Sequence, residues 1–481
     1  MAELARLGGV LGCAGLALLL CASRRDLRLA GLAAWTFGAA LLAAYLAPAG
    51  HGLELAAAGM GGLVLAGLGA AGLLRWPWAL AFATLVCIPV RIPVTIGSEE
   101  ANLLLPLYGV AGAFAVALAW ELLRDEERAR ELGGLAWPLA ALVTWLGLTL
   151  LWSDDVRQGS IFLLAFVLPF GLLALGFARL PWQARRLSQL LAALVALAVA
   201  FASIGVYQWL TRDVFWNPKV IVGNAYAPFY RVNSVFWDPS IYGRFLVVAI
   251  LGCLALVLLG ARERTLVALV GAIAVGWAGL LFSFSQSSFV ALIAGTLAAA
   301  AIVWRRRAVA AVVLVSAVLL AIGLATPQVR GSLLKESKAG LNKATSGRAG
   351  LVSNGLKIAL DHPVAGVGVG GFKRAYAERT GLKGGEPKKA ASHSTPVTVA
   401  AEAGFPGLAL LAWVAWAALV PALRGLRRTG AARASLVVGL TLGAIAVHSI
   451  FYNALFEDPT TWALAGLAAL AGAQRRREEA A

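Results

Sequence analysis

Residues 326–396 read TPQVRGSLLKESKAGLNKATSGRAGLVSNGLKIALDHPVAGVGVGGFKRAYAERTGLKGGEPKKAASHSTP, and nearly continuous apolar sequence flanks them on both sides. The stretch carries twelve Lys and Arg residues against four Asp and Glu residues. Loops of this length are usually functional or disordered, because a simple turn needs only a few residues. We interpret residues 326–396 as a partly ordered lid over a site for an anionic substrate that the membrane holds.

The remainder of the 481-residue chain is strongly apolar. It is 60% hydrophobic and only 14% charged, with a mean hydropathy of +0.80. Apolar runs of about 20 residues recur along its whole length, which predicts an all-α polytopic membrane protein with about 12–15 transmembrane helices and one large, partly helical extracytoplasmic loop before the last three spans. The candidate spans are 4–22, 29–47, 53–74, 76–96, 101–123, 135–152, 158–178, 187–210, 241–260, 265–284, 286–304, 308–325, 397–420, 434–453 and 459–473.

The formal net charge of +17 comes mostly from short Arg clusters at the ends of these spans. Arginines occupy alternate turns, which indicates membrane orientation and argues against a nucleic-acid partner. This pattern predicts a cytoplasmic C-terminus, with the 211–240 and 326–396 loops outside. The first apolar run, residues 7–22, follows only Arg6 and precedes an Arg-rich turn, so we expect a retained span and not a signal peptide.

Four segments follow from this topology. They are an extra N-terminal group of spans (1–74), a transmembrane core (75–325), the extracytoplasmic loop proposed to be catalytic (326–396), and C-terminal spans with a basic cytoplasmic tail (397–481). The four cysteines all lie in apolar runs, which predicts neither a disulfide nor a cysteine metal site.

The loop itself contains a predicted helix. Thr345 and Ser346 are plausible N-caps for the amphipathic run GRAGLVSNGLKIAL. Asp361-His362-Pro363 should end it, because the residue before a proline is disfavoured in the α region. The glycines of VAGVGVGGF supply flexible backbone, and their N–H groups suit an anion nest.

Histidine is scarce, with four in the chain. His51 lies in a short turn and is interpreted as incidental, and His362 as part of the helix stop. For His448, packing and a place in the site remain equally open. His393 is the best catalytic candidate, because it lies where the basic loop re-enters the membrane and can act there as a general base.

Arginines on the outer side are candidates for binding an anion. Arg231 and Arg348 can converge on one pyrophosphate, since a guanidinium binds phosphate in a bidentate way. Arg244 lies inside a span, where an ionisable residue is a functional hypothesis by default. Gln286 and the neighbouring hydroxyls of SFSQSSF can contact sugar hydroxyls, although helix packing is the simpler role for Ser287 and Ser288. No metal-binding pattern occurs, so we expect no cofactor and metal-independent chemistry.

Four stretches together carry a family resemblance: RVNSVFWDPSIYGRFL, SFSQSSFVAL, SGRAGLVSNGLKIALDHPVAGVGVGGF and HSTPVTVAAEAGFPGL. The chain resembles the O-antigen ligase/polymerase superfamily over roughly residues 200–410. The resemblance implies a bacterial inner-membrane glycosyltransferase that inverts the anomeric centre. Its donor would be a glycan on undecaprenyl pyrophosphate, and its acceptor a hydroxyl of a glycan, lipid or protein at the outer face.

Carried over by position, the resemblance assigns the pyrophosphate to Arg231 and Arg348, acceptor activation to His393, and a substrate contact to Glu402. Two departures stand out. Ser285-Gln286 replaces a common Ser-Arg, so a third cationic contact is either missing or supplied by Arg244. His393-Ser394 replaces a common His-Asn, which weakens an amide contact.

Three other functions remain possible. One is a scaffold or assembly subunit, which predicts that His393 and Arg348 are dispensable. A polymerase of the same superfamily would use the same residues as a ligase. A flippase for lipid-linked oligosaccharides would need polar groups along a path through the membrane, whereas the span interiors are Ala, Leu, Gly and Val and the polar groups crowd one face.

Overall fold

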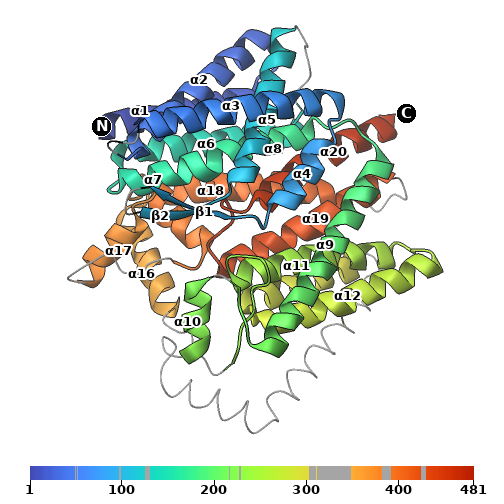
Figure 1. Ribbon diagram of the computed structural model, residues 1–481. Helices are drawn as coiled ribbons and strands as arrows, with labels where there is room; N and C mark the ends of the chain where they lie inside the picture. The colour runs from blue at the N-terminus through green and yellow to red at the C-terminus, as the bar shows by residue number, and fades with distance from the viewer. Residues whose placement is uncertain are drawn as a thin grey trace.

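Apolar helices make up most of the computed structural model (Figure 1), which describes residues 1–48, 50, 52–96, 99–124, 131–215, 217–226, 229–302, 310, 348–381, 392–423 and 430–480. Ten helices in these ranges are long and apolar enough to cross a membrane, and the apolar helical stretches Gly59–Arg75 and Gln286–Ile302 are shorter. The predicted all-α polytopic fold is confirmed. The span predicted at 308–325 and the N-caps predicted at Thr345 and Ser346 lie outside the described residues.

The first half of the chain contains these elements: α1 (Ala2–Cys21), α2 (Arg25–Leu46), α3 (Gly52–Arg75), α4 (Ala79–Cys87), β1 (Ile92–Ile96), β2 (Glu99–Leu103), α5 (Leu105–Leu123), the 3₁₀ turn η1 (Gly133–Leu135), α6 (Ala136–Thr149), the 3₁₀ turn η2 (Leu150–Trp152), α7 (Val156–Phe162), the π turn η3 (Leu163–Val167), α8 (Leu168–Ala178) and α9 (Ala184–Thr211).

The second half contains α10 (Pro218–Tyr226), α11 (Pro239–Leu258), α12 (Glu263–Ser283), the unlabelled helix Gln286–Ile302, α16 (Arg348–Asp361), α17 (Phe372–Thr380), α18 (Thr395–Leu423), α19 (Gly430–Phe451) and α20 (Pro459–Ala480). The bounds of α16 confirm both the helix predicted in the loop and its end at Asp361-His362-Pro363.

One predicted span is wrong. Residues 76–96 do not form a single transmembrane helix: α4 covers only Ala79–Cys87, and β1 follows it and pairs antiparallel with β2. Pro89 and Pro93 explain the difference, because proline lacks the N–H that a helix interior requires. The chain nevertheless passes from Arg75 at one end of the bundle to a hairpin that Figure 1 draws on the same side of the molecule as α7, α16 and α17.

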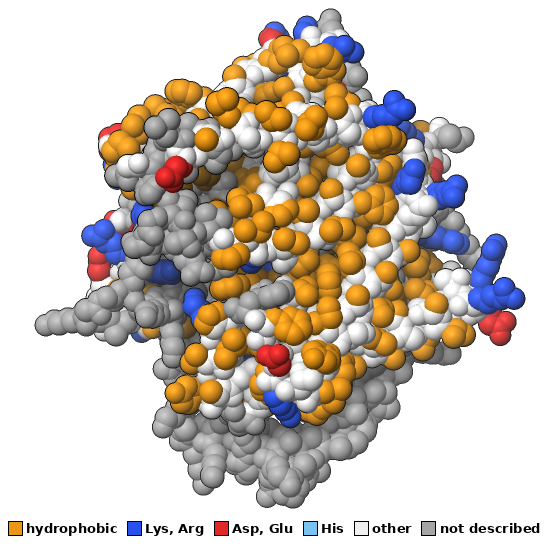
Figure 2. All heavy atoms as spheres, in the orientation of Figure 1, with side chains coloured by type: hydrophobic (Ala, Val, Ile, Leu, Met, Phe, Trp, Pro, Cys, Tyr) orange, Lys and Arg blue, Asp and Glu red, His pale blue; other side chains and the backbone are white. Residues whose placement is uncertain are grey.

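The two ends of the bundle differ in charge. At one end, which we call the basic end, a buried ion network links four segments: α2, α5, the stretch before η1 and the end of α8. Glu131 pairs with Arg28 at 2.9 Å and with Arg179 at 2.5 Å, and Arg179 also pairs with Glu121. Figure 2 shows Lys and Arg side chains along the right edge of the molecule, beyond a broad hydrophobic surface. This segregation is what the alternating arginine clusters predict.

Close backbone contact joins α1 to α2. A Cβ atom on Gly38 would lie 2.2 Å from the Gly12 nitrogen, and one on Gly15 would lie 2.3 Å from the Trp35 nitrogen. Small residues allow this approach between membrane helices. The pair packs into the main core with α6 and α8, so the N-terminal helices form part of the bundle.

Candidate active site

The end opposite the basic end, which we call the site end, is built from turns that are distant in sequence. The turn after α6 contacts the turn between α16 and α17: the Ser153 hydroxyl donates to the Val369 carbonyl at 2.7 Å, and the Trp152 indole donates to Ala365. The Arg374 guanidinium also donates to the Asp154 carbonyl at 2.9 Å. These bonds fix residues 365–374 against the transmembrane core.

The glycine turn, residues 366–371, requires its glycines. Gly366, Gly368 and Gly370 have φ angles of 65°, 82° and 85°, in the left-handed region that side chains disfavour. A Cβ atom on Gly368 would also lie 2.3 Å from the Ser153 Cα atom. The glycine turn therefore lies against its neighbours at backbone distance.

Glu402 occupies the anion nest that the sequence suggested. It projects from α18, and its Oε1 accepts from the Phe372 N–H at 3.2 Å, with the Gly370 N–H as a second donor. Behind it, α18 breaks at Gly404, whose φ is 68°, and the Phe405 N–H donates to the Pro363 carbonyl at 2.8 Å. Glu402 thus fixes the glycine turn to α18, and its predicted substrate contact stays a prediction.

His393 lies two residues before the start of α18 and is half-buried. Its φ of 54° is uncommon for a non-glycine residue. Hydrogen bonds at Ser392 hold this conformation, since its hydroxyl accepts from the Ser394 N–H at 3.1 Å and donates to the Ser394 carbonyl at 2.7 Å. Such outliers concentrate at functional sites, which fits the predicted catalytic role without testing it.

The two arginines predicted to hold pyrophosphate lie on different elements. Arg231 is half-buried beyond α10. The Asn224 side chain exchanges two hydrogen bonds with the Arg231 backbone, and the Arg231 Nε donates to the Ser283 carbonyl at 3.1 Å. Arg348 is the first residue of α16, and its side chain lies outside the described residues. The rest of α16 packs on α17 and α18 through Ile358, Phe372 and Ala401.

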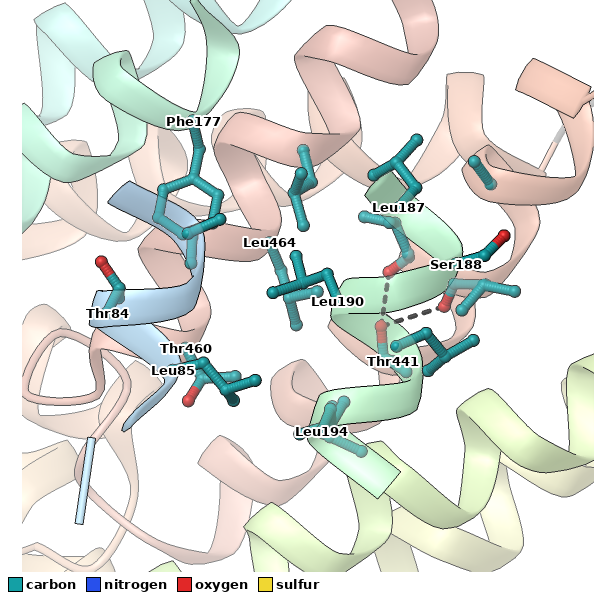
Figure 3. Close-up of a pocket in the computed structure, with 18 of the residues that line it drawn as sticks. Thr84, Leu85, Phe177, Leu187, Ser188, Leu190, Leu194, Thr441, Thr460 and Leu464 are labelled. Atoms are coloured by element: carbon teal, nitrogen blue, oxygen red, sulfur yellow. Dashed lines mark hydrogen bonds between the residues drawn. The ribbon is translucent and has the colours of Figure 1, made fainter. Parts of the chain in front are cut away.

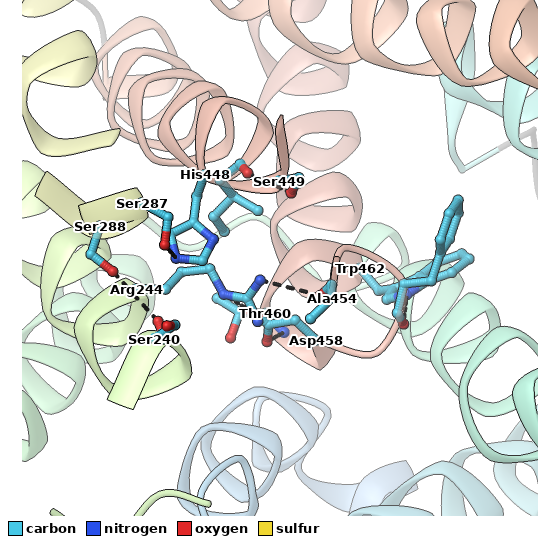
Figure 4. A network of polar contacts seen from close by, with 12 residues as sticks. Ser240, Arg244, Ser287, Ser288, His448, Ser449, Ala454, Asp458, Thr460 and Trp462 are labelled. Atoms are coloured by element: carbon cyan, nitrogen blue, oxygen red, sulfur yellow. Dashed lines mark hydrogen bonds and ion pairs between the residues drawn. The ribbon is translucent and has the colours of Figure 1, made fainter. Parts of the chain in front are cut away.

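Arg244 is buried and has partners within the protein (Figure 4). Its Nε lies 2.8 Å from Asp458 Oδ2, and its Nη1 donates to the Ala454 carbonyl at 3.2 Å. Asp458 also caps α20 by accepting from the Thr460 N–H at 2.9 Å. The predicted pyrophosphate contact of Arg244 is untested, and the pair joins α11 to the turn before α20.

A hydrogen-bonded serine cluster lies beside this pair. The Ser285 and Ser288 hydroxyls share a hydrogen bond of 2.7 Å. Ser287 bonds His448 Nε2 at 3.0 Å (Figure 4). The packing role expected for Ser287 and Ser288 is confirmed, because both are buried and bridge helices. Gln286 is exposed at the start of its helix.

A polar pocket of about 310 Å³ opens at the site end. Glycine-turn and α18 residues line it together with the turn before α20; among them are Gly370, Lys373, Ser392, Glu402, Asn453 and Glu457. Glu457 also lines a neighbouring cavity of about 20 Å³, which Arg91 and Arg244 share. Carboxylates, an amide and an ammonium around one pocket suit a ligand rich in hydroxyl groups.

Glu457, Arg91 and Lys373 were missed as site residues by the sequence reasoning. Burial raises the pKa of the Glu457 carboxyl above its ordinary value. The cations that oppose this rise are Arg91, Arg244 and Lys373. Two of the missed residues could have been found from the sequence, since Glu457 in FEDP and Arg91 in RIPVTIGSEE both lie in turns predicted on the outer face.

Metal ligands do not gather in the part of the chain that the structure describes: no group of three His, Cys, Asp or Glu side chains is placed to hold an ion.

These features define a multi-pass helical membrane protein with a polar pocket at one end. The comparison with protein families identifies its class more closely, because residues 271–412 match the family described as O-antigen ligase. The match over residues 271–412 confirms the predicted resemblance to the O-antigen ligase/polymerase superfamily. The matched range includes Gln286, Arg348, His393 and Glu402. A comparison with curated proteins found no match.

Proposed function

We propose that this protein is a metal-independent, inverting glycosyltransferase of the O-antigen ligase type. It would move a glycan from undecaprenyl pyrophosphate to an acceptor hydroxyl at the outer face of the bacterial inner membrane. The observation that carries the proposal is the polar pocket, because half of its lining residues lie in the matched ligase domain, including Ser392 beside His393.

The proposed reaction has one displacement step. The acceptor oxygen attacks the anomeric carbon of the donor sugar while His393 takes its proton. The bond between the anomeric carbon and the pyrophosphate oxygen breaks, and the pyrophosphate leaves with the electron pair. Attack from the opposite side inverts the anomeric centre.

Pyrophosphate is a good leaving group, so the protein's main tasks are positioning and charge stabilisation. Arg231 and Arg348 are proposed to face the departing pyrophosphate, with Arg244 as a further cation beside the small cavity. Glu402 would act mainly by fixing the glycine turn, which carries Lys373 into the pocket wall. Gln286 is exposed and accessible to a substrate sugar.

The test is glycan transfer by purified protein in detergent, with EDTA present. A synthetic undecaprenyl-pyrophosphate glycan serves as donor, and release of undecaprenyl pyrophosphate is measured with and without acceptor. We expect His393→Ala and Arg348→Ala to abolish acceptor-dependent release. His362→Ala is the matched control, because that exposed histidine lies in the turn after α16 and should be dispensable.

Full activity in His393→Ala would remove this residue from the mechanism. A polymerase, the second candidate, would transfer to another copy of the glycan and not to a lipid or protein acceptor. Movement of labelled donor across liposome membranes without release, and without dependence on His393, would replace the transferase by a flippase.

A further inference from the structure

The outer loop between α9 and α11 contains one short helix, α10, whose apolar side chains point away from the protein. None of its nine residues is buried. Ile221, Val222 and Ala225 share one face, since residues three and four apart in a helix are neighbours, and all three are exposed. Tyr226, the last residue of α10, is 87% exposed. A surface helix in water would turn such a face toward the core, so its exposure indicates apolar surroundings.

α9, the span before this loop, has apolar surroundings along its length. Leu187, Leu190 and Leu194 line an apolar cavity of about 390 Å³ inside the bundle (Figure 3). Leu210, next to the last residue Thr211, is exposed. α10 begins only seven residues after Thr211. It therefore starts close to the point at which the chain leaves the hydrocarbon of the membrane.

A different face of α10 is tied to the end of a second span. The Asn224 side chain exchanges two hydrogen bonds with the Arg231 backbone, at 2.8 and 3.0 Å. The Arg231 Nε in turn donates to the carbonyl of Ser283, the last residue of α12. The following backbone N–H, that of Val232, donates to the Phe282 carbonyl at 3.1 Å. α12 is long and apolar enough to span a membrane, so these bonds hold α10 at the level where that span ends.

The direction of α10 is the one expected of a helix on a membrane surface. Figure 1 draws α10 on the same side of the molecule as α16, and across the direction in which α11 and α12 run. Both of these helices can cross the bilayer, so a helix that runs across them lies along its surface. Helices of this kind bury one apolar face at the boundary between headgroups and acyl chains.

Aromatic side chains extend the exposed face of α10. Phe229 stacks on Phe284 with 4.7 Å between the ring centroids, and both rings are exposed. At the outer end of α9, Trp209 stacks on Phe282, and the Arg212 guanidinium lies 4.7 Å from the centroid of the Trp209 ring. Aromatic rings and cations gather where the hydrocarbon of a bilayer meets its headgroups. The composition of this surface therefore fits a lipid surface.

We propose that α10, Phe229 and Phe284 form an interfacial anchor, which binds the outer surface of the lipid bilayer and holds Arg231 at the level of the headgroups. The bilayer binds the exposed apolar face, and Asn224 is the positioning residue that joins this face to the Arg231 backbone. The membrane contact is independent of the proposed function, whereas the use of Arg231 for pyrophosphate rests on it. The pyrophosphate of a donor held in the membrane would lie at this same depth.

The first test measures which solvent surrounds α10 in nanodiscs of phosphatidylethanolamine and phosphatidylglycerol. Single nitroxide labels are attached to Val222→Cys and Lys219→Cys in the full-length protein, with its four native cysteines changed to alanine. Leu210→Cys on α9 is the membrane reference and Glu378→Cys on α17 the water reference, because both side chains are exposed.

We expect the Val222 label to collide with oxygen and to be shielded from a water-soluble nickel chelate, as the Leu210 label is. The Lys219 label should be more accessible to the chelate than the Val222 label. Chelate access at Val222 equal to that at Glu378 would overturn the proposal.

The second test follows hydrogen exchange at the Arg231 N–H in the same nanodiscs, with all native cysteines present. Val222→Glu should speed this exchange by about tenfold, because a charged side chain draws α10 away from the acyl chains. Ile221→Glu is a second variant in case the first does not fold. In Asn224→Ala protein, the Val222→Glu substitution should add nothing, since the link is already broken. Val364→Glu is the matched control, because this exposed valine lies at the site end outside α10.

Equal effects of Val222→Glu and Val364→Glu, or a full effect of Val222→Glu in Asn224→Ala protein, would overturn the link between the bilayer and Arg231. Asn224→Ala should also weaken binding of undecaprenyl pyrophosphate by up to about tenfold, and Asn224→Asp, which keeps the acceptor for the Arg231 N–H, should weaken it less. Unchanged binding, together with the expected label and exchange results, would refute the pyrophosphate role of Arg231 and leave the interfacial anchor established.

Discussion

The pair formed by Arg244 and Asp458 yields the sharpest prediction. Both side chains are buried, at 2% and 6% exposure, and their Nε and Oδ2 atoms lie 2.8 Å apart. Asp458→Asn keeps the size of the side chain and its ability to cap α20, because asparagine is an equally good N-cap. What it removes is the negative charge that pairs directly with the buried Arg244 guanidinium.

Breaking a buried ion pair at one partner typically costs about 3–5 kcal/mol, so we expect the free energy of unfolding to fall by about that amount. The measurement is equilibrium unfolding in mixed detergent. Arg244→Met combined with Asp458→Asn should cost less than the sum of the single variants, since the double variant buries no unpaired charge.

The control is Glu378→Gln, which breaks the exposed pair with Arg374 (side chains 61% and 66% exposed) and should cost less than about 1 kcal/mol. If Asp458→Asn and Glu378→Gln unfold alike, or if the double variant is strictly additive, the pair does not stabilise the contact between α11 and the turn before α20.

Three further predictions concern the site end. Glu402→Ala should release the glycine turn, because each lost hydrogen bond to a charged acceptor lowers stability by about 1.5–3 kcal/mol. Hydrogen exchange at the Phe372 N–H should then become faster. Unchanged exchange would show that the carboxylate does not hold the turn. Gly368→Ala should destabilise the protein more than Gly381→Ala. Both residues have positive φ, which costs a side chain about 1–2 kcal/mol of strain, but only at Gly368 would the new Cβ meet backbone, 2.3 Å from Ser153. Equal unfolding free energies in the two variants would contradict this close contact. The raised pKa of Glu457 means that the folded state binds this proton more tightly than the unfolded state, so stability should fall as pH rises from the ordinary glutamate range to the raised value; unfolding measured against pH should lose this slope in Glu457→Gln, and an identical slope in both proteins would assign it to another group.

Local signals in the sequence predicted much of the fold. Apolar length located the spans, and Asp361-His362-Pro363 marked the end of α16. The same apolar signal failed at residues 76–96, because averaging hydropathy over a window ignores the two prolines that end α4 and lead into β1. The rule that proline breaks a helix interior would have divided that stretch correctly.

The candidate site was less predictable, since its contacts join residues far apart in the chain. The glycines of the glycine turn suggested an anion nest, but no sequence rule shows that Glu402 fills it. Likewise, Arg244 was noticed as an intramembrane charge, while its pairing with Asp458 depends on how α11 packs against the turn before α20. Resemblance directed attention to His393 and Arg348, and the pocket residues Lys373 and Glu457 emerged only from the packing.

The ion network at the basic end also bears on the order in which the protein is made. Arg28 is 1% exposed in the finished molecule, yet its partner Glu131 is added by the ribosome 103 residues later. Arg179, the third member, follows after another 48 residues. Helices α1 and α2 must therefore enter the bilayer before this counter-charge exists, held together at first by their glycine contacts. Their final docking is a late step of synthesis, which can begin only when the segment after α5 has been translated.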